Sequence, residues 1–150
     1  MCPRNCNADR TTASGFCHGS NLAKVSKVMQ HYFEEPIISG EDSADGGSGA
    51  VFFSNCTLKC IYCQNSEISA GGAGKEISSE TLADIFKQLE NAGANNINLV
   101  SPTHYTKQII DALNIYRPNI PIVWNTSGYE KAETIALLKD YVDVYLTLSC

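Results

Sequence analysis

Three cysteines of the chain, Cys56, Cys60 and Cys63, stand close enough in sequence to act together on one loop. Their spacing is Cys-x3-Cys-x2-Cys, and they follow a short apolar run at residues 50–54. Three thiolates on a tight loop can ligate three irons of a 4Fe–4S cluster and leave the fourth iron without a protein ligand. Most electron-transfer clusters use four cysteines, so the triplet predicts a cluster with one iron open to a substrate or cofactor.

The three cysteines have two alternative interpretations: they could form a zinc site, or they could be buried thiols without a metal. Zinc usually takes four ligands, arranged as Cys-x2-Cys pairs or combined with histidine. The chain has no second Cys-x2-Cys pair, and the x3/x2 spacing is unusual for zinc. The spacing therefore favours the iron–sulfur cluster.

The segment Cys56-Thr-Leu-Lys-Cys60-Ile-Tyr-Cys63 resembles the CxxxCxΦC signature of the radical S-adenosylmethionine (radical SAM) superfamily, in which Φ is aromatic. The wider sequence resembles the pyruvate formate-lyase activating enzyme-like members, and the likeness runs over essentially the whole chain. The segments that carry it are VFFSNCTLKCIYCQN, CPRNCNADR with GFC, HYFEEPIISG, NINLVSPTHY and PIVWNTSGY.

The resemblance implies that Cys56, Cys60 and Cys63 hold a 4Fe–4S cluster whose open iron chelates S-adenosylmethionine. It also implies that one electron from the cluster cleaves the cofactor to methionine and a 5′-deoxyadenosyl radical, which takes a hydrogen atom from a substrate. Tyr62 matches the aromatic position of the motif, which lies beside the adenine. A flat ring next to the cluster can stack on a base.

Further candidates for cofactor contacts follow two of the expected strands. Many radical SAM proteins carry Gly-Gly-Glu after the second strand, whereas this chain has Leu-Val-Ser-Pro-Thr-His there. Ser101, Thr103 and His104 could supply polar contacts to S-adenosylmethionine or substrate, and Asn125 could do so after the next strand. The alternative is an ordinary turn, since Asn, Ser, Thr and Gly commonly form turns and helix caps.

A second group of cysteines lies near the N-terminus, at Cys2, Cys6 and Cys17. It could form a small zinc or auxiliary metal site with His18 or Cys150 as a fourth ligand. The alternative is a loop of thiols with no metal, which would be open to oxidation.

The elements that must position these residues are predicted from apolar periodicity. Residues 1–20 show little periodicity and are expected to be irregular. Residues 21–35 have the apolar spacing of a helix, which is expected to end before Pro36. Residues 39–49 are expected to form a link. After residue 50, four short apolar strands alternate with three amphipathic helices, which is typical of a parallel α/β sheet. The strands are expected at 50–54, 96–100, 120–124 and 142–148, and the helices at 80–91, with Ser78 or Ser79 as its N-cap, at 105–116 and at 129–139.

The predicted architecture is a partial (β/α) barrel of the radical SAM type, with about four of the family's six βα units. Residues 1–49 are expected to form a cysteine-containing N-terminal extension and linker, and residues 50–150 the N-terminal part of the core. The match to relatives breaks off within the fourth strand, so we expect a truncated core whose last strand is an exposed apolar edge.

Composition excludes several classes of function. The chain has 150 residues with a net charge of −5, and 43% of its residues are hydrophobic, which indicates a folded globular domain. An acidic chain without a Lys/Arg run is a poor nucleic-acid binder, and no apolar stretch is long enough to span a bilayer. Seven cysteines without a secretory signal favour metal or redox chemistry over disulfides, and a cytoplasmic location.

The function expected is therefore that of a radical SAM enzyme that activates a glycyl radical enzyme or acts on a small substrate. It implies a low-potential electron donor, flavodoxin or ferredoxin, and a low-oxygen cytoplasm. The alternatives are a non-catalytic iron–sulfur protein for electron transfer or sensing, with Cys17 or Cys150 closing the cluster, an inactive fragment, and a structural zinc protein.

Overall fold

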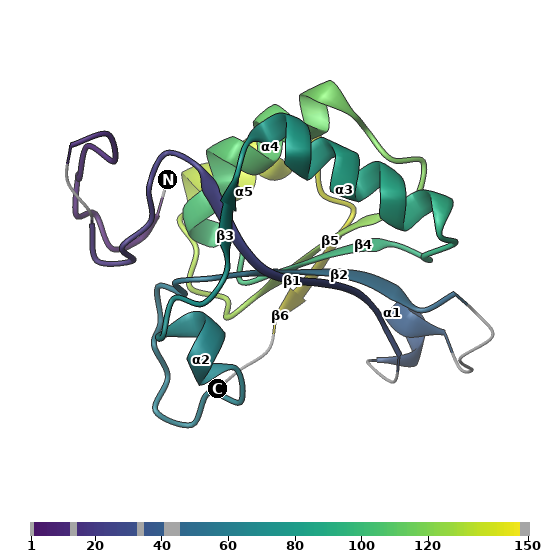
Figure 1. Cartoon of the computed structure of the whole chain (residues 1–150), viewed down its shortest axis with the longest axis horizontal. Helices are drawn as coiled ribbons and strands as arrows, with labels where there is room; N and C mark the ends of the chain where they lie inside the picture. Colours follow the sequence, from purple (N-terminus) through teal and green to yellow (C-terminus); the bar gives the residue numbers. More distant parts are fainter. Residues whose placement is uncertain (1, 13–14, 33–34, 41–45, 148–150) are drawn as a thin grey trace.

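The computed structural model describes residues 2–12, 15–32, 35–40 and 46–147. Twelve helices and strands alternate along this part of the chain (Figure 1). They are β1 (Ala23–His31), α1 (Pro36–Ser39), β2 (Ser48–Phe53), α2 (Ser66–Ser69), β3 (Lys75–Ile77), α3 (Ser79–Asn91), β4 (Ile97–Val100), the 3-10 helix η2 (Thr103–Tyr105), α4 (Thr106–Ile115), β5 (Ile122–Thr126), α5 (Ala132–Leu138) and β6 (Val144–Thr147).

The strands form one mixed sheet in the order β3-β1-β2-β4-β5-β6. The four strands β2, β4, β5 and β6 are parallel to one another, which confirms the expected run of parallel strands. β1 is antiparallel to both β2 and β3, and this antiparallel edge of the sheet was not predicted. The architecture is that of a partial β/α fold with two antiparallel strands added to one side.

The helix predicted over residues 21–35 is wrong, because residues 23–31 form β1. Ala23 and Val25 are buried on one face, whereas Val28 is 39% exposed, so the helix-like spacing does not mark a buried stripe. Pairing with β2 fixes the segment as a strand, with Val28 opposite Val51 and Met29 opposite Ala50. β-branched residues such as Val25 and Val28 also favour a pleated strand.

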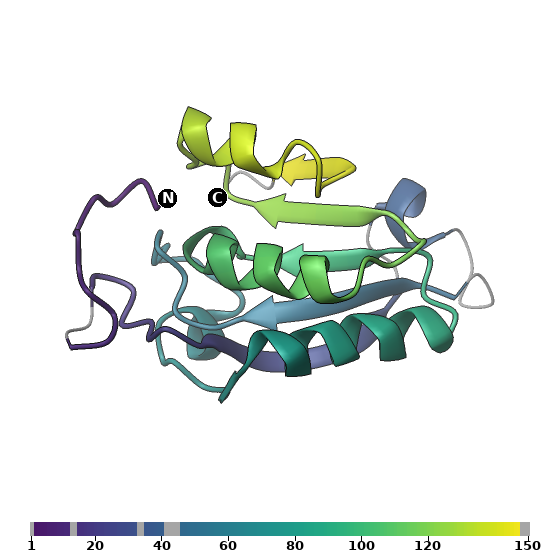
Figure 2. The same ribbon diagram turned by 90° about the horizontal axis from the view of Figure 1, so that it is seen from above.

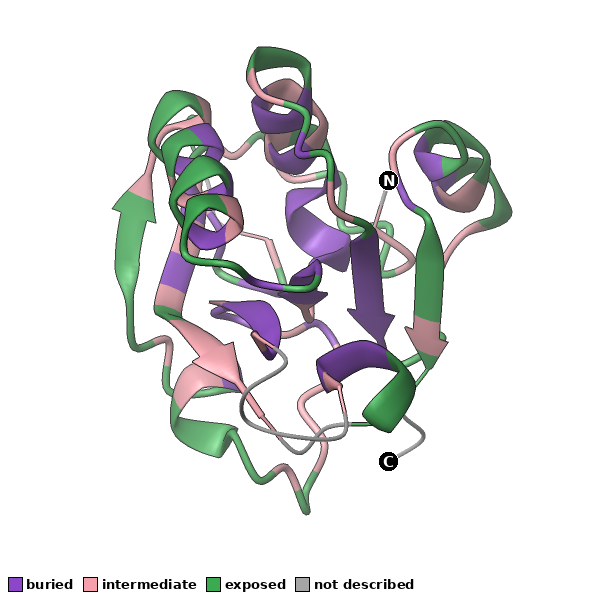
Figure 3. Ribbon diagram, turned by 90° about the vertical axis from the view of Figure 1, so that its right-hand side faces the viewer, coloured by how far each residue is buried: buried purple, intermediate pink, exposed green. Residues whose placement is uncertain are grey.

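The helices α3, α4 and α5 cover one face of the sheet (Figures 1 and 2). α3 confirms its prediction closely: Leu82, Phe86 and Leu89 are buried, and the Ser78 hydroxyl accepts a hydrogen bond from the Thr81 amide as the N-cap. The central strands and the inward sides of these helices are buried (Figure 3), and Trp124 on β5 is among the largest fully buried side chains. Burial of these apolar faces is the main stabilising contribution to such a layered fold.

The remaining boundaries differ from expectation by a few residues or by a short element. The strand expected at 120–124 runs from Ile122 to Thr126, the last helix begins at Ala132 rather than 129, and β6 begins at Val144 rather than 142. The three-residue helix η2 precedes α4, and the short elements α1, α2 and β3 were not predicted. Residue 148, the expected end of the last strand, lies outside the described residues.

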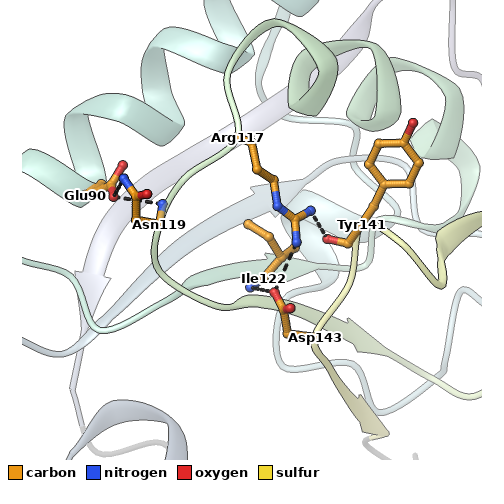
Figure 4. Close-up of polar contacts among 6 residues, drawn as sticks. All are labelled: Glu90, Arg117, Asn119, Ile122, Tyr141 and Asp143. Carbon is orange, nitrogen blue, oxygen red and sulfur yellow. Dashed lines mark hydrogen bonds and ion pairs between the residues drawn. The ribbon is translucent and has the colours of Figure 1, made fainter.

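Polar contacts fasten the end of the sheet that lies opposite the cysteine loop (Figure 4). Asp143 accepts a hydrogen bond from the Ile122 amide at 2.8 Å, and Arg117 donates to the Tyr141 carbonyl. Glu90, near the end of α3, accepts from the backbone and side-chain amides of Asn119. These contacts join the last two strands to the helices at the amino ends of the strands, where side chains usually serve stability.

No helix in the described ranges is long and apolar enough to cross a membrane.

Candidate functional site

The cysteine triplet lies on the loop that joins β2 to α2. Ser54, directly after β2, donates its amide to the Lys24 carbonyl at 2.9 Å, and the Asn55 amide donates to the Ile68 carbonyl at 3.2 Å. The Cys63 amide donates to the Cys60 carbonyl at 3.3 Å, which makes a tight turn between the last two cysteines. The loop is therefore closed at its base, and all three thiols are half-buried within it.

The three cysteines line one cavity of about 620 Å³. Its floor is a row of side chains from three parallel strands, since Phe52 pairs with Val100 and Val100 pairs with Asn125 across β2, β4 and β5. The carboxyl ends of parallel strands are the usual place for ligands in α/β folds. The volume falls within the range of ordinary cofactor pockets.

The donor set of the cavity fits a cluster with an open iron. No Asp, Glu, Lys, Arg or His lines it, so within the described residues three thiols are the anionic ligands available there. The Ser69 hydroxyl lies 3.3 Å from Cys63 Sγ, where it can hydrogen-bond a thiolate. As the described residues stand, no three His, Cys, Asp or Glu side chains are gathered closely enough to hold a metal ion. The thiols would therefore have to turn toward one another as a cluster is bound.

Three of the other predicted site residues reach the same cavity. Ser101 and Asn125 line it, and the Ser101 amide donates to the Asn125 carbonyl at 2.9 Å. Ser101 has a left-handed backbone (φ 57°), which places it on a sharp turn directly after β4. Tyr62 also lines the cavity, but its side chain lies at the rim and is 95% exposed.

Thr103 and His104 do not line this cavity. Thr103 is buried, and its hydroxyl donates to Glu130 at 2.5 Å. His104 is 5% exposed, and its Nε2 lies 2.7 Å from the Ser54 carbonyl oxygen. Burial lowers the pKa of His104 to about 4, so the imidazole is neutral near pH 7.

Glu130 was not foreseen from the sequence. Its Oε1 accepts hydrogen bonds from Thr103, from the Trp124 indole at 3.3 Å and from Thr126 at 2.6 Å, which ties the turn after β4 to the end of β5. In the sequence, a carboxylate four residues after a strand is the only local sign of this role for Glu130. Its three hydrogen-bond donors lie on two separate elements, η2 and β5, which only the folded chain brings together. Thr126 and Ser127, which line the cavity, belong to the Asn-Thr-Ser-Gly segment from which only Asn125 was singled out.

The N-terminal segment packs against the cysteine loop. Arg4 donates through Nε to the Thr57 carbonyl at 2.9 Å, and its guanidinium lies 4.2 Å from the centre of the Phe16 ring. Lys59, on the loop itself, lies 4.6 Å from the same ring. Figure 2 shows this segment beyond the carboxyl ends of the strands. The segment is therefore part of the surroundings of the site.

Residues 50–150 match the radical SAM superfamily. The chain is also 32% identical, over 157 aligned residues, to an uncharacterized protein of Methanocaldococcus jannaschii, MJ0674. That alignment covers 98% of this chain and 44% of the relative, so the chain spans less than half of the relative's length. No solved structure matches the chain. The family match over the cysteine loop and its parallel strands shows that the chain belongs to the radical SAM superfamily.

Proposed function

We propose that this chain binds a 4Fe–4S cluster through Cys56, Cys60 and Cys63 and holds S-adenosylmethionine beside it for reductive cleavage. The observation that carries the proposal is the shared cavity: three thiols, with no carboxylate, imidazole, amine or guanidinium beside them, line a pocket at the carboxyl ends of three parallel strands. When bound, the cluster supplies the electron that cleaves S-adenosylmethionine to methionine and a 5′-deoxyadenosyl radical.

The residues of the chain have distinct parts in this proposal. The three thiolates would hold the cluster and leave one iron open to the amino and carboxylate groups of S-adenosylmethionine. The Ser101 hydroxyl and the Asn125 amide, which both line the cavity, would hydrogen-bond the cofactor. Tyr62 folds from the rim onto the adenine, which is consistent with its exposed position in the structure.

The finer function follows the likeness to pyruvate formate-lyase activating enzyme-like proteins. The radical would then be passed to a glycyl radical enzyme or to a small substrate in an anaerobic cytoplasm. Flavodoxin or ferredoxin would reduce the cluster. Exposed Ile61, with Lys59 on the same loop, gives such a donor an accessible surface beside the cluster.

The test separates binding from turnover, because the chain spans less than half of its relative. The chain is reconstituted anaerobically with iron and sulfide and reduced with dithionite, and its EPR spectrum is recorded with and without S-adenosylmethionine. We expect the cluster signal to change on addition of S-adenosylmethionine, and 5′-deoxyadenosine to form slowly. An unchanged signal would identify a non-catalytic iron–sulfur protein, and zinc without iron or sulfide would identify a structural zinc protein.

A further inference from the structure

A second cavity lies between the N-terminal segment and the start of α4, and it shares no lining residue with the first. Its volume is about 430 Å³, and it is lined by Cys2 and Cys6 of the N-terminal segment and by His104 from the turn after β4. The two parts are about a hundred residues apart in sequence and meet only in the folded chain. Two thiols and an imidazole facing one space are potential metal ligands.

The hydrogen bond of His104 fixes the ring tautomer that can bind a metal ion. A carbonyl oxygen can only accept, so the contact with Ser54 at 2.7 Å places the ring proton on Nε2. Nδ1 then carries the lone pair, and it is buried without a hydrogen-bond partner among the described residues. A metal-ligating histidine usually donates its other ring N–H to a carboxylate or backbone carbonyl, as His104 does here.

The third thiol of the N-terminal group, Cys17, packs beside this cavity. It is 3% exposed, and Arg10, which lines the cavity, donates to its Sγ at 3.5 Å. Burial raises the pKa of Cys2, and the neighbouring thiols of Cys17 and Cys6 raise it further. Cys6 and Cys17 therefore both lie within electrostatic range of Cys2.

The backbone of this segment comes close to one of the thiols. A Cβ placed on Gly15 would lie 2.6 Å from Cys6 Sγ, so the sulfur can occupy its present position because residue 15 is glycine. The charges around the cavity also suit a metal ion. Three thiolates bound to a divalent cation carry one net negative charge. Arg10, Lys107 and Lys131 line the same cavity with one carboxylate, Asp9, so the charged residues around the thiols are net positive and offset that charge.

We propose that Cys2, Cys6, Cys17 and His104 form a second metal site, separate from the cluster cavity, that takes a thiophilic divalent ion such as zinc. Three thiolates and one imidazole are a common ligand set of structural zinc. The side chains are not yet gathered within ligand distance in the described structure, so binding must draw residues 2–17 toward His104. No helix or strand has to break for this, because the described residues of that segment form only turns and irregular chain.

The structure favours His104 over the fourth ligands expected from the sequence. His18 is exposed, and Cys150 lies outside the described residues. An ion bound here would fix the N-terminal segment against the cysteine loop, which Arg4 already contacts through Thr57 and His104 through Ser54.

The test uses the full chain with Cys56, Cys60 and Cys63 all changed to Ala, so that no cluster can form and the outcome is independent of the proposed enzyme function. The variant is prepared anaerobically and titrated with Co²⁺, whose thiolate charge-transfer and tetrahedral d–d bands report the ligands. We expect one Co²⁺ per chain, displaced by Zn²⁺. A parallel zinc determination on the wild-type chain, after cluster reconstitution, is expected to find one zinc beside the iron and guards against misfolding of the triple variant.

Two further substitutions in this background identify the ligands. Cys6→Ser changes an exposed side chain, and His104→Gln keeps a donor for the Ser54 carbonyl, so neither should unfold the chain. Each is expected to weaken Co²⁺ binding at least tenfold, whereas the control His18→Ala leaves it unchanged. Absence of the thiolate bands, full affinity in Cys6→Ser or His104→Gln, or a resting Cys2–Cys6 disulfide found by mass spectrometry would overturn the proposal.

Discussion

His104 Nε2 lies 2.7 Å from the carbonyl oxygen of Ser54, two residues before the first cysteine of the cluster motif. This hydrogen bond joins the turn after β4 to the first residue of the loop that carries the cysteines. The two residues are 50 positions apart, so the contact forms only once β2 and β4 are paired. The loop that carries the thiols is thus fixed to the sheet from both of its neighbouring strands.

Replacing Tyr62 should affect cofactor binding but not folding. The side chain is 95% exposed, so Tyr62→Ala should leave the free energy of unfolding within about 0.5 kcal/mol of the wild-type value. Loss of stacking on adenine should weaken S-adenosylmethionine binding by about 1–3 kcal/mol. Urea unfolding and equilibrium binding to the reconstituted chain measure the two effects. Unchanged affinity would remove Tyr62 from the cofactor site.

Ser101 allows its hydroxyl to be tested apart from its backbone. Its φ of 57° is easily adopted by glycine and strained for alanine, so the variants Ser101→Gly and Ser101→Ala differ in backbone strain while both lack the hydroxyl. If the hydroxyl binds S-adenosylmethionine, both should lose about 0.5–1.5 kcal/mol of binding free energy. A loss in the alanine variant alone would indicate that the turn, rather than the hydroxyl, matters.

Glu130 should contribute to stability through its three hydrogen bonds. Glu130→Ala leaves the hydroxyls of Thr103 and Thr126 and the indole of Trp124 without their acceptor. We expect a loss of about 2–3 kcal/mol in the free energy of unfolding, measured in urea. The exposed Glu76 of β3 supplies the control, since Glu76→Ala should change stability by less than about 0.5 kcal/mol. Equal effects of the two substitutions would show that the Glu130 contacts are unimportant.

The two outer strands of the sheet predict how the chain behaves in solution. β3 carries exposed Lys75 and Glu76, which discourage edge pairing, whereas β6 exposes Val144 (41%) and Tyr145 (38%) and pairs with β5 alone among the described strands. We expect the chain to self-associate through β6 and Val144→Lys to weaken that association at least tenfold. Size-exclusion chromatography with light scattering measures it. A wild-type chain that stays monomeric at its highest soluble concentration would contradict the expectation.

Local signals made part of the fold predictable. The apolar stripe of α3 and its Ser78 cap lie within one segment, and the short apolar strands from residue 50 onward alternate regularly with helices. β1 was missed because its identity depends on pairing with β2, whose partner residues are 17 to 28 positions away. Helix-like spacing of a few apolar residues cannot distinguish a helix from an irregular edge strand.

The grouping of the candidate site residues was predictable to a similar degree. The Cys-x3-Cys-x2-Cys spacing placed Cys56, Cys60 and Cys63 on one loop, and position after a strand indicated Ser101 and Asn125, all of which line one cavity. The environment of His104 could not be foreseen, because it depends on Ser54 and on the approach of the N-terminal segment. Such contacts join residues that only the completed sheet brings together.

The central claim is that the two cysteine groups hold different metals, with the cluster on Cys56, Cys60 and Cys63. The most direct measurement is the iron and sulfide content, with the brown absorbance, of single Cys→Ala variants reconstituted anaerobically. Replacing any of these three should abolish a stable 4Fe–4S cluster, because two thiolates of the motif cannot hold it. Replacing Cys2, Cys6 or Cys17 should leave iron and sulfide near the wild-type content. Equal losses from both groups would contradict this division of the cysteines.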